Sequence, residues 1–154
     1  MRSYSLLAAF ILGACATTAV QTVAEDLSPA ASVVAPIERV VHAAPHGKAT
    51  ITHLAEGKNA YLGRLTLLGG AKVPEHRDTT EEYLYILEGR GEVVIDDVTY
   101  PVGPGSAIYM PANAKVSYTN GPDELVTLQV FAGPVPAKKY EDWNPESALT
   151  KESR

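Results

Sequence analysis

The chain has 154 residues, of which 45% are hydrophobic and 20% are charged. This length suits one globular domain, because a domain usually takes ~100–200 residues. The formal net charge of −5 argues against a nucleic-acid-binding protein, since phosphate binding needs clusters of Lys and Arg. The 12 Gly and 11 Pro indicate many turns, and the single Cys excludes an internal disulfide and a Cys-based zinc cluster.

The first residues have the pattern of an export signal. Arg2 precedes an apolar run from Leu6 to Ala14, which is shorter than the ~20 residues that a membrane-spanning helix needs. A basic start, a short apolar run and small residues after it are typical of a secretory signal peptide. We therefore predict that residues 1–14 are a signal peptide and that the protein is exported.

The only cysteine, Cys15, follows that run directly, at the end of the sequence LGAC. This sequence resembles the lipobox of bacterial lipoproteins, whose cysteine is lipidated and becomes the mature N-terminus; ordinary cleavage without lipid is the alternative. The resemblance implies an anchored protein in the envelope of a Gram-negative bacterium, at the outer membrane or in the periplasm, since Ala16 rather than Asp comes next. Residues 15–47, rich in small residues, Thr, Ser and Pro near their start, would form a flexible tether.

From Lys48 onward, short segments rich in β-branched residues, Leu and Tyr alternate with turn residues. Short strands with such spacing are typical of a sandwich or barrel. We predict an all-β fold, a single jelly-roll barrel over residues 48–133, because this closure leaves few exposed strand edges. Asp96-Asp97 predicts a tight hairpin. The expected strands are Thr50–Leu54, Tyr61–Leu68, Tyr83–Leu87, Glu92–Ile95, Val98–Val102, Ala107–Met110, Lys115–Thr119 and Leu125–Phe131.

The prolines of residues 134–154 exclude a central strand there. We expect Tyr140 and Trp143 to pack this tail against the barrel, and residues 144–154 to form a short helix or to fray.

One expected strand carries apolar side chains on both of its faces. Tyr83, Tyr85 and Leu87 lie on the face opposite to Glu82. This outer face should therefore be covered by the second sheet, by the tail or by a second copy of the chain in a homodimer.

Three side chains of the metal-ligating type lie around one turn. His76 and Asp78 are two residues apart on an extended segment and so face the same side. Glu82 begins the next strand, on the face that carries Leu84 and Ile86. An imidazole and two carboxylates could therefore converge at one end of the barrel, a donor set suited to a divalent ion such as Mn, Fe, Ni or Zn.

The spacing around these residues resembles the first motif of the cupin family, which are small jelly-roll barrels. Asp78 stands where that motif has its second His. The positions that match in register are Gly70, His76, Glu82 and Gly89.

The second cupin motif is matched in part, by Gly105, Pro111 and Asn120. Asn113 replaces a Gly, a change that the turn can accept because Asn tolerates a positive φ. Val116 replaces the motif's His and has no lone pair to offer.

The resemblance implies a metal site at His76, Asp78 and Glu82 that lacks one ligand. Val116, Tyr118 and Asn120 share one face of their expected strand, which predicts a ligand pocket beside that site. Three interpretations stay open. The barrel could bind a small polar, sugar-like or aromatic molecule without metal, which we favour. It could hold a metal with water in the remaining positions and act as a dioxygenase- or isomerase-like enzyme. It could also be structural only.

The other histidines are weaker candidates. His53 lies on an expected strand with Ile51 on its face, so it could point inward and replace the missing ligand. His42 and His46 flank Pro45 and are expected in solvent.

The anchoring prediction can be tested apart from the fold. Substituting Cys15→Ala should abolish lipid attachment and release the protein from the membrane fraction. The barrel should stay folded, because Cys15 lies well outside the expected strands. Incorporation of radiolabelled fatty acid, followed by cell fractionation, measures both effects. Absence of label in the wild type would show that the lipobox interpretation is wrong.

Overall fold

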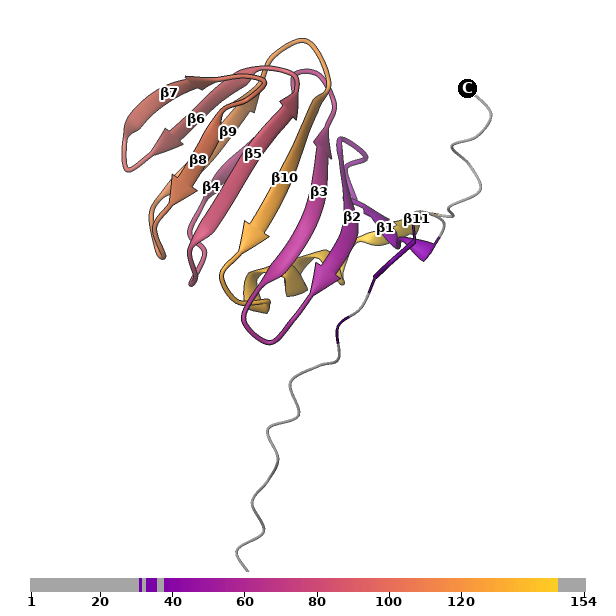
Figure 1. Ribbon diagram of the computed structural model, residues 1–154. Helices are drawn as coiled ribbons and strands as arrows, with labels where there is room; N and C mark the ends of the chain where they lie inside the picture. The colour runs from indigo at the N-terminus through magenta and orange to yellow at the C-terminus, as the bar shows by residue number, and fades with distance from the viewer. Residues whose placement is uncertain (1–30, 32, 36–37, 147–154) are drawn as a thin grey trace, which may run out of the picture.

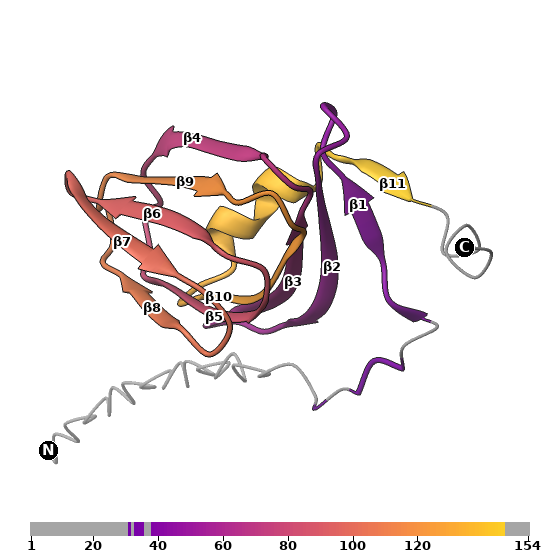
Figure 2. The ribbon, with the colours of Figure 1, turned by 90° about the horizontal axis from the view of Figure 1, so that it is seen from above.

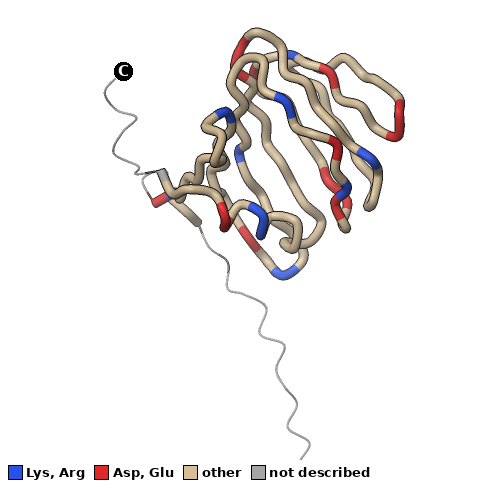
Figure 3. Tube along the Cα trace, turned by 180° about the vertical axis from the view of Figure 1, so that it is seen from behind, with Lys and Arg blue, Asp and Glu red and all other residues tan. Residues whose placement is uncertain are grey.

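The computed structural model describes residues 31, 33–35 and 38–146 (Figure 1). The predicted signal peptide and Cys15 lie outside the described residues. Within the described part, no helix has both the length and the apolar character needed to cross a membrane. Figure 3 shows acidic and basic residues interspersed along the described trace, without a long run of one sign.

The strands form two antiparallel sheets that face each other (Figures 1 and 2). This arrangement confirms the predicted all-β jelly-roll fold. The seven-stranded sheet contains, in spatial order, β11 (Asn144–Glu146), β1 (Val41–Ala43), β2 (Ala49–Glu56), β3 (Tyr61–Leu67), β10 (Leu125–Phe131), β5 (Glu82–Glu88) and β8 (Ala107–Met110). The four-stranded sheet contains β4 (Lys72–His76), β9 (Val116–Asn120), β6 (Gly91–Ile95) and β7 (Val98–Val102).

The strands β1 and β11 lie where the sequence was expected to have none, and β4 lies where only an extended segment around His76 was expected. β1 falls inside the expected tether, and β11 replaces the expected helix or frayed end; the two pair with each other, and β1 also pairs with β2. Each is three residues long, too short for alternation to be recognised in the sequence. Pro145 is accommodated because β11 is the edge of its sheet, where a missing N–H breaks no ladder.

The tail between these elements closes one end of the barrel. The 3-10 helix η2 (Val135–Tyr140) lies across that end, between the two sheets (Figures 1 and 2). Tyr140 is buried, and its ring contacts Trp143 edge to face with 4.9 Å between the ring centroids.

Strand β5 has one face buried between the sheets and one face exposed on the outside. Glu82 and Ile86 are buried between the sheets, whereas Tyr83, Tyr85 and Leu87 are 42%, 48% and 39% exposed on the outer face. Neither the second sheet nor the described part of the tail covers that face, contrary to two of the expected arrangements. A covering second copy remains a prediction.

The turn residues adopt the backbone conformations that their chemistry predicts. Asp96 and Asp97 have φ of 46° and 68° and form the tight β6–β7 hairpin. Asn113 has φ of 62°, which confirms that it can take the place of a glycine. These residues can stay left-handed because Asn and Asp tolerate that region better than other side chains.

Gly91 leaves room for the ring of Tyr118 against the four-stranded sheet. A Cβ at this position would lie 2.2 Å from the Tyr118 hydroxyl oxygen and 2.5 Å from the backbone oxygen of Thr119. We expect Gly91→Ala to lower the free energy of unfolding by ~1–3 kcal/mol, because a well-packed site must move to accept it. Urea denaturation measures this loss. Gly103→Ala is the control, since its nearest neighbour is the flexible Arg90 side chain at 3.4 Å; equal losses in both variants would contradict the explanation.

Candidate metal and ligand site

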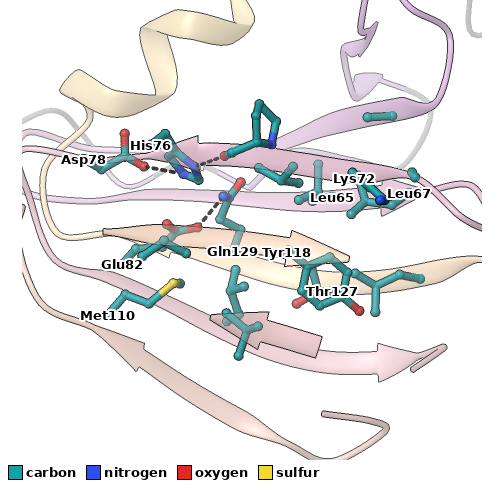
Figure 4. Close-up of a pocket in the computed structure, with 18 of the residues that line it drawn as sticks. Leu65, Leu67, Lys72, His76, Asp78, Glu82, Met110, Tyr118, Thr127 and Gln129 are labelled. Carbon is teal, nitrogen blue, oxygen red and sulfur yellow. Dashed lines mark hydrogen bonds and ion pairs between the residues drawn. The ribbon is translucent and has the colours of Figure 1, made fainter. Parts of the chain in front are cut away.

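Three predicted ligand side chains come together at the end of the barrel that η2 closes. His76 ends β4, Glu82 begins β5, and Asp78 lies in the turn between them. One ligand atom from each lies within 4.8 Å of the others (Figure 4). The Nε2 atom of His76 is 3.7 Å from Oδ2 of Asp78.

The orientation of His76 is set by its other ring nitrogen. Nδ1 lies 2.9 Å from the carbonyl oxygen of Pro74. A carbonyl can only accept, so Nδ1 carries the proton and the lone pair of the neutral ring is on Nε2. Such a bond to the distal nitrogen is the usual way in which a metal-binding imidazole is held.

Glu82 is buried, and its carboxylate accepts a hydrogen bond from a neighbouring side chain. The side-chain amide of Gln129 donates to Oε1 of Glu82 at 2.5 Å, and the hydroxyl of Tyr140 donates to Oε1 of Gln129 at 2.7 Å. Burial raises the pKa of Glu82, an effect that the Gln129 hydrogen bond and the nearby Lys139 charge partly oppose. The same burial raises the pKa of Tyr140 well above its usual range.

Asp78 has a cationic partner from the tail. Nζ of Lys139, in η2, lies 3.1 Å from Oδ2 and 3.4 Å from Oδ1 of Asp78. Neither Lys139 nor Gln129 was predicted from the sequence as part of the site. The alternation of β10 could have placed Gln129 on the inner face, but no local pattern relates Lys139 to Asp78, 61 residues earlier.

Val116 occupies the position opposite His76. The two residues are paired across β4 and β9, and Val116 is buried. Position 116 therefore lies beside the site, but its Val side chain offers no ligand atom to His76, Asp78 and Glu82.

A cavity of about 330 Å³ extends from the three residues into the barrel. Figure 4 shows His76, Asp78 and Glu82 at one end and Leu65 and Leu67 toward the other. The wall residues of this cavity are mostly apolar, and they include Leu84, Ile86, Val93, Met110, Val116, Tyr118 and Leu125.

Asn120 was predicted to line the pocket, but the structure places it elsewhere. Its buried side-chain amide donates to the backbone carbonyls of Leu68 and Asp123, at 2.9 Å each. These bonds tie the end of β9 to two loops, and Asn120 is absent from the described wall of the cavity. These hydrogen bonds give Asn120 a structural role at the end of β9.

His53 does not replace the missing ligand. Its Nε2 lies 3.0 Å from Nδ1 of His42, and its Nδ1 lies 3.0 Å from the hydroxyl oxygen of Tyr61. His42 is thus half-buried against His53 and not in solvent as expected, because β1 packs beside β2. His46 is exposed, as expected, and borders the cavity.

The donor set fits a divalent ion. One imidazole nitrogen and the oxygens of two carboxylates suit several first-row metals, so the set does not identify one. Three protein ligands would leave positions for water or for a bound molecule. His76, Asp78 and Glu82 could therefore hold a metal that also contacts whatever enters the cavity.

Comparison with known proteins agrees with this architecture. Residues 63–131 match the Cupin_2 family model, described as a cupin domain. The dimethylsulfoniopropionate lyase DddW of Ruegeria pomeroyi is 34% identical over 78 residues, which are 51% of each chain. The chain spans only about half the length of the curated relatives that it matches, between 51% and 59%.

Solved structures share the fold. An RmlC-like cupin from Shewanella frigidimarina superposes with a TM-score of 0.61 at 14% identity, covering 68% of this chain and 92% of that one. The polyketide cyclase RemF from Streptomyces resistomycificus has a TM-score of 0.51 at 26% identity, covering 55% and 64%. Residues 63–131 are thus similar to a cupin domain, and the solved structures share the jelly-roll fold with this chain.

Proposed function

We propose that the barrel binds a small organic molecule in its cavity, next to a divalent ion held by His76, Asp78 and Glu82. The observation that carries this proposal is the convergence of these three side chains at one end of a mostly apolar cavity. Such a centre would have no protein ligand at Val116, while its three candidate ligands are oriented and partnered.

The cavity limits the kind of ligand. Its volume of about 330 Å³ is at the low end of the ~300–1,000 Å³ typical of small-molecule sites. Apolar walls suit a ring, and the polar end suits one or two oxygen-bearing groups. An aromatic or sugar-like molecule with a polar end meets both requirements.

A metal-dependent enzyme, of dioxygenase or isomerase type, is the second candidate. Two observations favour it: a three-ligand set leaves open positions as catalytic centres do, and matched proteins bear the names of a lyase and a polyketide cyclase. When bound, a metal would supply Lewis acidity. In such an enzyme, His76 and the two carboxylates would position the reacting group, and one carboxylate could move a proton.

On the basis of the sequence, we also propose that the protein is exported, carries a lipid at Cys15 and forms a homodimer. A lipid anchor would keep the barrel at the envelope surface. The exposed Tyr83, Tyr85 and Leu87 on one sheet face are the surface that a second copy would cover. Analytical ultracentrifugation of the protein lacking residues 1–15 would measure the assembly.

Metal content tests the centre directly. Protein purified after growth with added Mn, Fe, Ni and Zn should contain a stoichiometric transition metal by elemental analysis. His76→Ala should lose it, because Nε2 is the one nitrogen donor of the set. His46→Ala is the control, since this exposed side chain borders the cavity outside the set. A wild type that stays metal-free under these conditions would contradict the metal centre.

Restoring the missing ligand gives a second test. Val116→His should place an imidazole opposite His76 and raise metal affinity, because the two positions are paired across β4 and β9. The buried ring costs ~1–3 kcal/mol if it finds no partner. Bound metal should offset that cost, so the melting temperature should rise more on adding Ni²⁺ or Zn²⁺ than in the wild type.

The matched control is Ser117→His, which puts an imidazole on the next residue of β9, outside the cavity wall. Its response to metal should equal that of the wild type. An equal response of Val116→His and the wild type would show that position 116 cannot contribute to the centre.

A further inference from the structure

We propose that Lys139 is an exchangeable cation of the cavity, which pairs with Asp78 in the metal-free protein and with an anionic group of the ligand in the metal-bound protein. This inference rests on the proposed function and deepens it, because it assigns the ligand to a chemical class, small organic acids with an apolar body.

The ammonium of Lys139 is held at the mouth by more than one contact. It pairs with both carboxylate oxygens of Asp78, at 3.1 and 3.4 Å. It also lies 4.9 Å from the centroid of the Phe131 ring and 5.6 Å from that of Tyr140. Aromatic faces attract an ammonium at such distances, so the cation has a place to rest that does not depend on Asp78.

The fold fixes the backbone position of Lys139. Lys139 is in η2, next to the buried Tyr140, whose hydroxyl bonds to Gln129 inside the barrel. The side chain itself remains 39% exposed, so its head can move while its backbone stays in place. Its neighbour Lys138 is exposed and does not border the described cavity.

The same carboxylate serves the ammonium and the candidate metal. Asp78 is one of the three possible ligands, and a divalent ion bound there would repel the ammonium at short range. The ammonium must therefore withdraw when metal binds. A four-carbon stem with three rotatable donors can redirect its charge over the mouth of the cavity.

The charges around the cavity favour an anion once the acids are engaged. Among the described residues, three cationic side chains border it, Lys72, Arg77 and Lys139, against the two acids Asp78 and Glu82. This local excess of positive charge occurs in a chain whose net charge is −5. A metal ion that occupies both acids leaves no other carboxylate among the described wall residues to pair with these cations, and a carboxylate on the ligand would restore the balance.

The experiment compares the full-length wild type with Lys139→Met and Lys138→Met, after confirming by circular dichroism that all are folded. Calorimetric titration with Mn²⁺ alone should show about tenfold tighter binding in Lys139→Met, because a like charge has been removed from the site. Lys138→Met should match the wild type. Lys139→Arg keeps the charge and should also match it.

A second titration uses the Mn²⁺-loaded proteins and two probes of similar shape, benzoate and the neutral benzamide. Wild type should prefer benzoate, and Lys139→Met should lose that preference while Lys138→Met retains it.

The outcomes separate this inference from the proposed function. Equal Mn²⁺ affinity in wild type and Lys139→Met overturns the exchange and leaves the metal centre standing. A loaded wild type that does not prefer benzoate overturns the assignment of an anionic ligand. Absence of Mn²⁺ binding in the wild type and in Lys139→Met defeats both the metal centre and the exchange. Binding in Lys139→Met alone supports the exchange and shows that the ammonium blocks the site.

Discussion

The burial of the Glu82 carboxyl between two sheets is the constraint on which the rest of the site depends. A buried charge is unfavourable unless hydrogen bonds compensate for the lost water. Gln129 supplies such a bond from β10, and Tyr140 holds the Gln129 amide from η2. The C-terminal segment is thereby joined to the centre of the barrel, and its anchoring brings Lys139 to the mouth. One acid at the start of β5 thus organises groups from β10 and η2, both distant from it in the chain.

The sequence could predict features that depend on residues close to one another in the chain. Alternation along single strands and the turn chemistry of Asp96-Asp97 and Asn113 depend on near neighbours, and the structure agrees with them. His76, Asp78 and Glu82 could be grouped because one short turn relates them. Lys139 could not be added to this group, because its place follows from how the tail packs across the barrel end. The strands β1 and β11 were missed for a similar reason, since their pairing is the only regular feature that they have.

Val116 and Asn120 show that a match to a motif position does not by itself define a site residue. Both lie on β9, and both side chains are buried. Val116 faces the cavity opposite His76, whereas Asn120 lies at the strand end and binds loop carbonyls. Alternation assigns them to one face, but it cannot tell where along that face the cavity ends. Tyr118, between them on the strand, lines the cavity, and its hydroxyl donates to Oδ1 of Asn120 at 3.4 Å.

The substitutions at positions 78 and 116 also change the charge of the centre, apart from the number of its ligands. The set implied by the cupin resemblance has three neutral imidazoles and one carboxylate, so a bound divalent ion keeps a formal charge of +1. Here Asp78 adds a second carboxylate and Val116 adds nothing, so the same ion would be formally neutral. A neutral centre attracts an anion less by its own charge. The attraction must then come from the protein, and the cations at the cavity, Lys139 above all, are placed to supply it.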